Sequence, residues 1–166
     1  AQTQLPLLRL PDKKKVGLYI SIPFCPTRCS YCSFVSHSIE SAKKLVPQYV
    51  EKLCEEIEIT GKLIADTGIS VDTVYIGGGT PTSLSAEQLG TVMKKLSESV
   101  DLSGIREYTV EAGRPDTITA EKLETIKKLG ADRISVNPQT LNNDVLKAIG
   151  RNHSAEQIFE AYEMAG

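Results

Sequence analysis

Three cysteines, Cys25, Cys29 and Cys32, stand close together as C-x3-C-x2-C, directly after a strand-like run at residues 18–22. Three thiolates can hold three irons of a [4Fe-4S] cubane and leave the fourth iron without a protein ligand. An iron with a vacant coordination position can bind and transform a small molecule, whereas a cluster held by four cysteines mainly passes electrons. The spacing therefore predicts an iron–sulfur site that performs chemistry.

Two other uses of these cysteines follow from the sequence. With His37 they would complete a tetrahedral zinc shell, although zinc knuckles usually take their ligands from two separated turns. Disulfides are disfavoured, because four cysteines in 166 residues, three of them crowded together, do not resemble a secreted framework. We also see no signal peptide, and we therefore expect a reducing, cytoplasmic location. The fourth, Cys54, lies on the apolar stripe of a predicted helix and is expected to be a buried hydrophobic residue.

The composition is that of an ordinary globular chain, with 40% hydrophobic residues and no apolar run long enough to span a membrane. A net charge of −2 and a pI near 5.8 argue against a dedicated nucleic-acid-binding protein, which would carry a basic face. We therefore predict neither a nucleic-acid nor a membrane partner.

Strand-like and helix-like segments alternate from residue 16 onward. Residues 1–15 have two prolines and no clear periodicity, so we expect an irregular lead-in or linker there, followed by one domain over residues 16–166. Ser85 and Gln88 form a capping-box pair at the start of a helix. The alternation predicts an α/β fold with parallel strands. The strands are predicted at 16–22, 71–76, 107–112 and 133–136, and the helices at 47–68, from 85, at 119–130, at 142–149 and at 154–166.

Polar or glycine-rich residues follow each of the four predicted strands. The carboxyl ends of parallel strands meet at one edge of a sheet, so these residues are expected to form a single site. Successive glycines let the backbone approach a ligand closely, and the lysine and spacing of a phosphate loop are absent. His37 and His153 lie in polar stretches and are expected to be exposed. The four segments are Cys25–Cys32; Gly77, Gly78, Gly79, Thr80 and Pro81; Glu111 with Arg114; and Asn137, Pro138 and Gln139.

Several motifs together resemble the radical S-adenosylmethionine (SAM) family of oxygen-independent coproporphyrinogen III oxidases, also called coproporphyrinogen dehydrogenases. The resemblance runs from about residue 16 to the end. It rests on Tyr19-Ile-Ser-Ile-Pro-Phe-Cys25, Cys29, Tyr31-Cys32, Gly77-Gly-Gly-Thr-Pro-Thr82 and Arg133-Ile-Ser-Val-Asn-Pro-Gln139.

This resemblance implies a set of cofactor-binding residues. Cys25, Cys29 and Cys32 would ligate a [4Fe-4S] cluster whose open iron binds the amino and carboxylate groups of SAM. The positions that would contact SAM or its surroundings are Tyr19, Tyr31, Gly78, Gly79, Thr80, Glu111, Gln139 and Arg151. No separate acid or base is implied, because hydrogen abstraction by a deoxyadenosyl radical needs none.

In the resembled family, that radical takes hydrogen from propionate side chains of coproporphyrinogen III. Loss of carbon dioxide and an electron then leaves vinyl groups and gives protoporphyrinogen IX, in heme biosynthesis. The expected partners are thus a tetrapyrrole substrate and an electron donor such as flavodoxin or ferredoxin. Ser21 stands where the better-known oxidases have His, and Phe34 stands where they have a further cysteine. A heme chaperone, or a radical SAM enzyme acting on another tetrapyrrole or on RNA, is therefore an alternative.

The length of the chain limits how many strands of the barrel it can supply. Four strands cannot close the six-strand partial barrel typical of this superfamily, so we expect a fragment of such a barrel. The outer edge of the fourth strand would then be uncovered. We expect these residues alone to self-associate and to be inactive, which light scattering and activity measurements would test.

Overall fold

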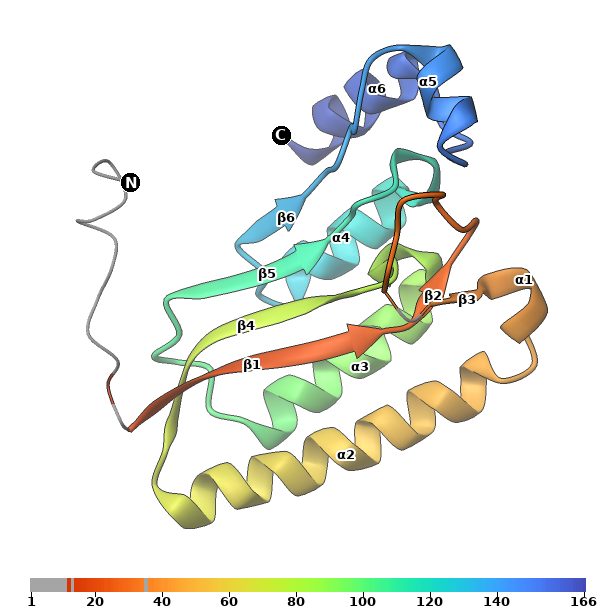
Figure 1. Cartoon of the computed structure of the whole chain (residues 1–166). Coiled ribbons are helices and arrows are strands. Elements are labelled where there is room, and N and C mark those ends of the chain that lie inside the picture. Colours follow the sequence, from red (N-terminus) through yellow and green to blue (C-terminus); the bar gives the residue numbers. More distant parts are fainter. Residues whose placement is uncertain (1–11, 13, 35) are drawn as a thin grey trace.

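The computed structural model describes residues 12, 14–34 and 36–166. Four parallel strands form one sheet in the order β1 (Lys15–Ile22), β4 (Ser70–Gly78), β5 (Glu107–Glu111) and β6 (Arg133–Ser135), as Figure 1 shows. These four strands therefore have the same order in the sheet as in the sequence, and each connection between them contains at least one helix. Most of the predicted lead-in at 1–15 lies outside the described residues, and β1 begins at Lys15, one residue earlier than predicted.

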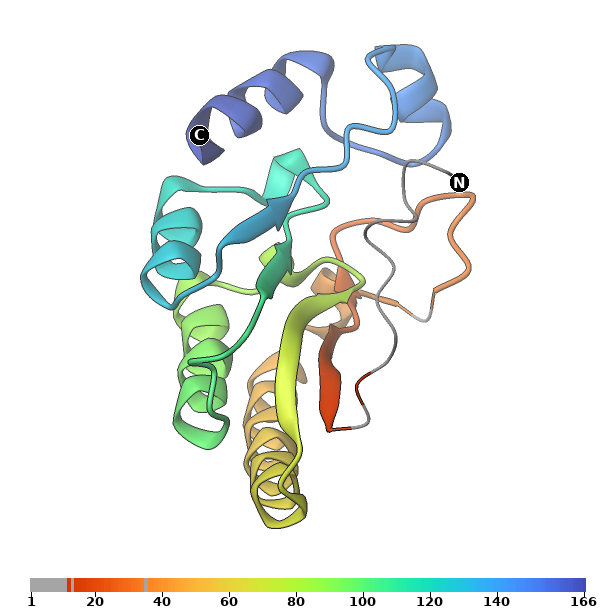
Figure 2. The ribbon, with the colours of Figure 1, turned by 90° about the vertical axis from the view of Figure 1, so that its left-hand side faces the viewer.

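Three helices pack on one face of this sheet (Figure 2). They are α2 (Val46–Thr67), α3 (Ala86–Ser99) and α4 (Ala120–Lys128). The helix predicted at 47–68 ends before Gly68, whose φ of 65° is left-handed and whose N–H donates to the carbonyl of Ala65. The predicted capping box is present, since Ser85 Oγ accepts from Gln88 N–H and the Gln88 side chain accepts from Ser85 N–H.

The hydrophobic core lies between the sheet and these three helices. Ile22 and Ile76 from the strands and Leu89 and Leu96 from α3 are completely buried. Alternate residues of each strand face the opposite side, where Tyr19 and Tyr75 occupy paired positions on β1 and β4. One face of the sheet is thus apolar and covered by helices, and the other carries polar and aromatic side chains.

The remaining elements lie near the carboxyl ends of the strands or beyond β6 (Figure 1). A small parallel pair, β2 (Phe24–Cys25) and β3 (His37–Ser38), encloses the cysteine segment and was not predicted. The short helix α1 (Ile39–Ala42) follows it. After β6 come α5 (Asn143–Ala148) and α6 (Ala155–Ala165), close to the predicted helices. Among the helices of the described residues, none has the length and apolarity needed to cross a membrane.

Candidate functional site: a cysteine-lined cavity at the strand ends

A cavity of about 170 Å³ lies at the carboxyl ends of the strands, and residues that follow all four strands line it. Ten of the eleven predicted site residues are in its wall. The exception is Tyr19, which lies on the polar face of the sheet below the cavity. The ten are Cys25, Cys29, Tyr31, Cys32, Gly78, Gly79, Thr80, Glu111, Gln139 and Arg151.

The cysteine loop, residues 25–32, is held in place by a distant part of the chain. Thr27 Oγ1 donates to the carbonyl of Gly150 at 2.7 Å, and Ser30 N–H donates to the carbonyl of Ile149 at 3.0 Å. Within the loop, Cys32 N–H donates to the carbonyl of Cys29 at 3.2 Å. All three cysteines are half-buried free thiols, so the loop presents them to the cavity with restricted access from solvent.

The glycine-rich segment approaches the cysteine loop closely. Gly79 N–H donates to the carbonyl of Ile22 at 2.8 Å, and Thr80 N–H donates to that of Phe24 at 2.7 Å. A Cβ at Gly79 would lie 2.7 Å from the Phe24 carbonyl oxygen and 3.0 Å from Cys25 Sγ, so only glycine fits there.

One detail of this segment was predicted wrongly. Gly77 and Gly78 belong to β4 and do not follow it, because their backbones pair with Ser21 and Ile22 of β1.

Glu111 is the last residue of β5, and a tyrosine orients its carboxylate. Tyr75 Oη donates to Glu111 Oε1 at 2.5 Å. Burial and the neighbouring carboxylate raise the pKa of Tyr75, so this phenol remains a donor at neutral pH. The Tyr75 ring in turn stacks on Tyr19, with 5.8 Å between ring centroids and 10° between ring planes. Tyr19 is therefore connected to the cavity through Tyr75 and Glu111.

Arg151 and Gln139 close the cavity on the side of β6. Arg151 is 9% exposed; its Nη1 donates to the carbonyl of Gly113 at 2.8 Å and its Nη2 donates to Tyr31 Oη at 3.1 Å. Its Nε is buried without a hydrogen-bond partner in the structure. Gln139 has a φ of 65°, the one non-glycine residue with positive φ among the described residues. A free buried donor and a strained backbone are both common where a ligand binds.

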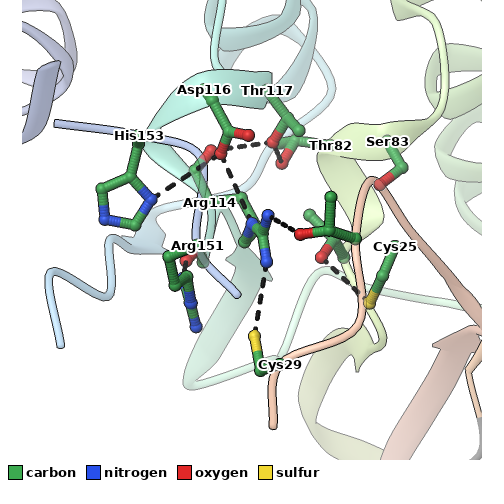
Figure 3. Close-up of polar contacts among 12 residues, drawn as sticks. Cys25, Cys29, Thr82, Ser83, Arg114, Asp116, Thr117, Arg151 and His153 are labelled. Atoms are coloured by element: carbon green, nitrogen blue, oxygen red, sulfur yellow. Dashed lines mark hydrogen bonds and ion pairs between the residues drawn. The ribbon is translucent and has the colours of Figure 1, made fainter. Parts of the chain in front are cut away.

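Arg114, which was expected at this site together with Glu111, also lines the cavity, and it belongs to a polar cluster whose burial was not predicted from the sequence. Arg114 is 2% exposed and contacts Cys29, Thr27 and Asp116 (Figure 3). His153 was expected to be exposed, and this is wrong, since its side chain is fully buried. Its ring lies 3.8 Å from Asp116 Oδ1, and burial lowers its pKa. The sequence shows a polar stretch at both places and gives no sign of burial.

The donor set fits a cluster better than a single ion. Among the residues that the structure describes, no three or more His, Cys, Asp and Glu side chains are arranged to hold one metal ion. In a cubane each thiolate binds a different iron, so the sulfur atoms need only surround a common space. The three cysteines lie around one cavity, whereas His37 is exposed in β3.

Comparison with known proteins identifies the class. The sequence profile of the radical SAM superfamily matches residues 19–166, and the chain belongs to this superfamily. Members use a [4Fe-4S] cluster and SAM, so the predicted cofactors and the predicted partial barrel are confirmed.

Within this superfamily, the chain is similar to proteins whose names refer to coproporphyrinogen oxidation and to heme. The chain is 44% identical, over 96% of its length, to the oxygen-independent coproporphyrinogen-III oxidase-like protein HemZ of Bacillus subtilis, of which it covers 33%. It is 43% identical, over 89% of its length, to the heme chaperone HemW of the same organism, of which it covers 38%. The solved structure of coproporphyrinogen III oxidase HemN from Escherichia coli superposes with a TM-score of 0.79 and 29% identity, covering 98% of this chain and 36% of that one. The chain thus spans 33–38% of the length of these three relatives.

Proposed function

We propose that this chain forms the cofactor-binding part of a radical SAM oxidoreductase of heme biosynthesis, which converts propionates of coproporphyrinogen III to vinyl groups. The observation that supports this proposal best is the convergence of three cysteines, the glycine-rich strand end and three charged side chains, Glu111, Arg114 and Arg151, on one cavity. The likeness to HemZ and HemN supports the choice of substrate. The product of two such reactions is protoporphyrinogen IX.

Different residues of the cavity would bind the cluster and SAM. Cys25, Cys29 and Cys32 would each hold one iron. Gly78, Gly79 and Thr80 would hold the methionyl end of SAM, and the wall is completed by Tyr31, Glu111, Gln139 and Arg151. When bound, the cluster and SAM supply one-electron cleavage of SAM and abstraction of hydrogen from the substrate.

The chain itself contributes orientation and restricted access. Tyr75 holds the Glu111 carboxylate in one direction, and Arg151 offers its unpartnered Nε to an acceptor such as a carboxylate. The cysteine loop is fixed at both Thr27 and Ser30, which keeps the thiols at the cavity wall. No side chain is required to move a proton in the hydrogen-abstraction step.

We also propose a cellular compartment and a type of electron donor. Four free cysteines fit a reducing compartment, so we place the protein in the cytoplasm. A small redox protein such as flavodoxin or ferredoxin would reduce the cluster.

The test uses the full-length protein that contains this chain, reconstituted with iron and sulfide without oxygen. We expect a reduced [4Fe-4S] signal in electron paramagnetic resonance (EPR) that changes when SAM is added, and SAM-dependent formation of protoporphyrinogen IX. Cys29→Ala should abolish product and lower the iron content. Cys54→Ala is the matched control, because Cys54 packs against the hydrophobic core, away from the cavity. Full turnover by Cys29→Ala would refute the proposal.

A second candidate function is heme delivery. The 43% identity to the heme chaperone HemW favours it, and so do Ser21 and Phe34, which differ from the better-known oxidases. Phe34 is 67% exposed and lies in the wall of the cavity, where it offers an apolar surface to a flat ligand. Stable heme binding by the full-length protein, with no conversion of coproporphyrinogen III, would favour the chaperone over the oxidase.

A further inference from the structure

Arg114 is a buried cation in contact with one of the three cluster cysteines. It directly precedes the 3-10 turn Pro115–Thr117, and its side chain lines the cavity and contacts the cysteine loop. Its guanidinium has three contacts, and each uses a different nitrogen. Nη1 donates to Cys29 Sγ at 3.4 Å, Nη2 to Thr27 Oγ1 at 2.6 Å and Nε to Asp116 Oδ1 at 3.4 Å (Figure 3).

The charge around Arg114 is only partly balanced by the protein. Asp116 supplies one carboxylate, at one corner of the guanidinium, and its side chain is 17% exposed. The nearby His153 adds no charge near neutral pH, because burial lowers its pKa. A cation buried to this extent gains from a further negative neighbour, and the contact at Nη1 is a sulfur atom.

We propose that Arg114 is a positioning residue that raises the reduction potential of the cluster through its hydrogen bond to Cys29 Sγ. This inference rests on the proposed function only in assuming that the three cysteines hold a [4Fe-4S] cluster. Hydrogen bonds to cluster sulfurs and nearby charge are among the factors that set the potential of an iron–sulfur cluster. Reduction adds one electron, and hence one negative charge, to the cluster. A fixed cation and an N–H donor stabilise that added charge more than they stabilise the oxidised cluster.

Arg114 also contributes to holding the loop, and the two roles can be separated. Thr27 Oγ1 accepts from Arg114 and donates to the carbonyl of Gly150, so Thr27→Val removes the loop contacts and leaves the bond to Cys29 Sγ. Arg114→Met removes the bonds to Cys29 Sγ and to Thr27 Oγ1, and leaves Thr27 bonded to Gly150. Arg114→Lys keeps a positive charge but lacks the planar fork that reaches sulfur, threonine and carboxylate together.

The experiment is a redox titration of the anaerobically reconstituted full-length protein, followed by EPR without SAM. For Arg114→Met, we expect the ratio of reduced to oxidised cluster at a fixed potential to fall roughly tenfold, which equals about 59 mV for a one-electron couple. Arg114→Lys should show a smaller fall. Thr27→Val should leave the potential of the loaded cluster close to that of the wild type.

The matched control is Arg106→Met, which removes an arginine that is 53% exposed and paired with Asp72 near the opposite ends of the strands. It should leave the potential unchanged. The proposal is overturned if Arg114→Met keeps its cluster at the wild-type potential, or if Thr27→Val lowers the potential as much as Arg114→Met. It is also overturned if both Arg114 variants lose their iron, because Arg114 would then be purely structural. A wild-type protein without any cluster signal would instead refute the proposed function.

Discussion

Gly79 has no room for a side chain. A Cβ added there would meet both the backbone of Phe24 and the sulfur of Cys25, so a side chain would displace the segment that carries the first cluster cysteine. The predicted importance of the glycine-rich segment thus has a steric explanation that the sequence alone does not provide.

Gly79→Ala is expected to destabilise the protein by about 1–3 kcal/mol, the usual cost of overpacking. It should also reduce the iron retained after reconstitution, because the added methyl group displaces the Cys25 loop. Gly104→Ala is the matched control, since a Cβ at Gly104 meets no atom within 4 Å. Urea unfolding and iron analysis measure the two effects. Normal iron content in Gly79→Ala would contradict this explanation.

His153 makes the stability of the fold depend on pH. Burial is the main cause of its lowered pKa; Arg151 and Arg114 also lower it, and the Pro138 carbonyl and Asp116 oppose this shift. In the unfolded chain, histidine binds a proton as the pH falls through about 6.5, whereas folded His153 remains neutral until a lower pH. The unfolded state therefore gains protons first, and stability falls as the pH drops below that value.

We expect His153→Gln to lose less stability than the wild type when urea unfolding of the cluster-free protein is compared at pH 7.5 and pH 5.5. His37→Gln controls for the removal of an exposed histidine. Equal pH dependence in His153→Gln and the wild type would show that another group is responsible.

The residues of the site were predictable to different degrees. The cysteines, glycines, Glu111 and Arg151 could be found because motif and strand position indicate them. The burial of Arg114 and His153 could not, because it arises from contacts with residues far away in the sequence, Thr27 for Arg114 and Asp116 for His153. A polar loop residue looks the same in a sequence whether solvent or another loop surrounds it.

The secondary structure elements follow their sequence signals closely where those signals are local. The start of α3 is determined by Ser85 and Gln88, and the end of α2 by Gly68. The β2–β3 pair was missed because each strand has only two residues and no periodicity can be read from such a length. The pair forms because the chain returns to the sheet edge after the cysteine loop.

Ser85→Ala should destabilise the protein by about 1 kcal/mol, because it removes the oxygen that accepts from Gln88 N–H. Ser97→Ala on the exposed face of the same helix is the control and should change stability by less than about 0.5 kcal/mol. Thermal or urea unfolding compares the two variants. Equal effects would mean that the capping box adds little to this helix.

The sheet as a whole was predictable from the alternation of strands and helices, because parallel neighbours require helical crossovers. Because the strands are parallel, their carboxyl ends were also expected at one edge of the sheet, and the site lies there. β6 pairs with β5 alone among the described residues, so the expected free edge is present. Whether the 166-residue chain self-associates through that edge remains a prediction for light scattering.

The residues that hold the cysteine loop in place lie far downstream in the sequence, so the ribosome adds them long after the cysteines. Thr27 and Tyr31 are joined to Gly150 and Arg151, which lie 123 and 120 positions further on. At typical translation rates of about 5–20 residues per second, a 120-residue delay lasts roughly 6–24 s. During that interval the nascent thiols lack their later neighbours and are open to oxidants. We therefore expect stable cluster insertion to follow the synthesis and docking of the loop around Arg151.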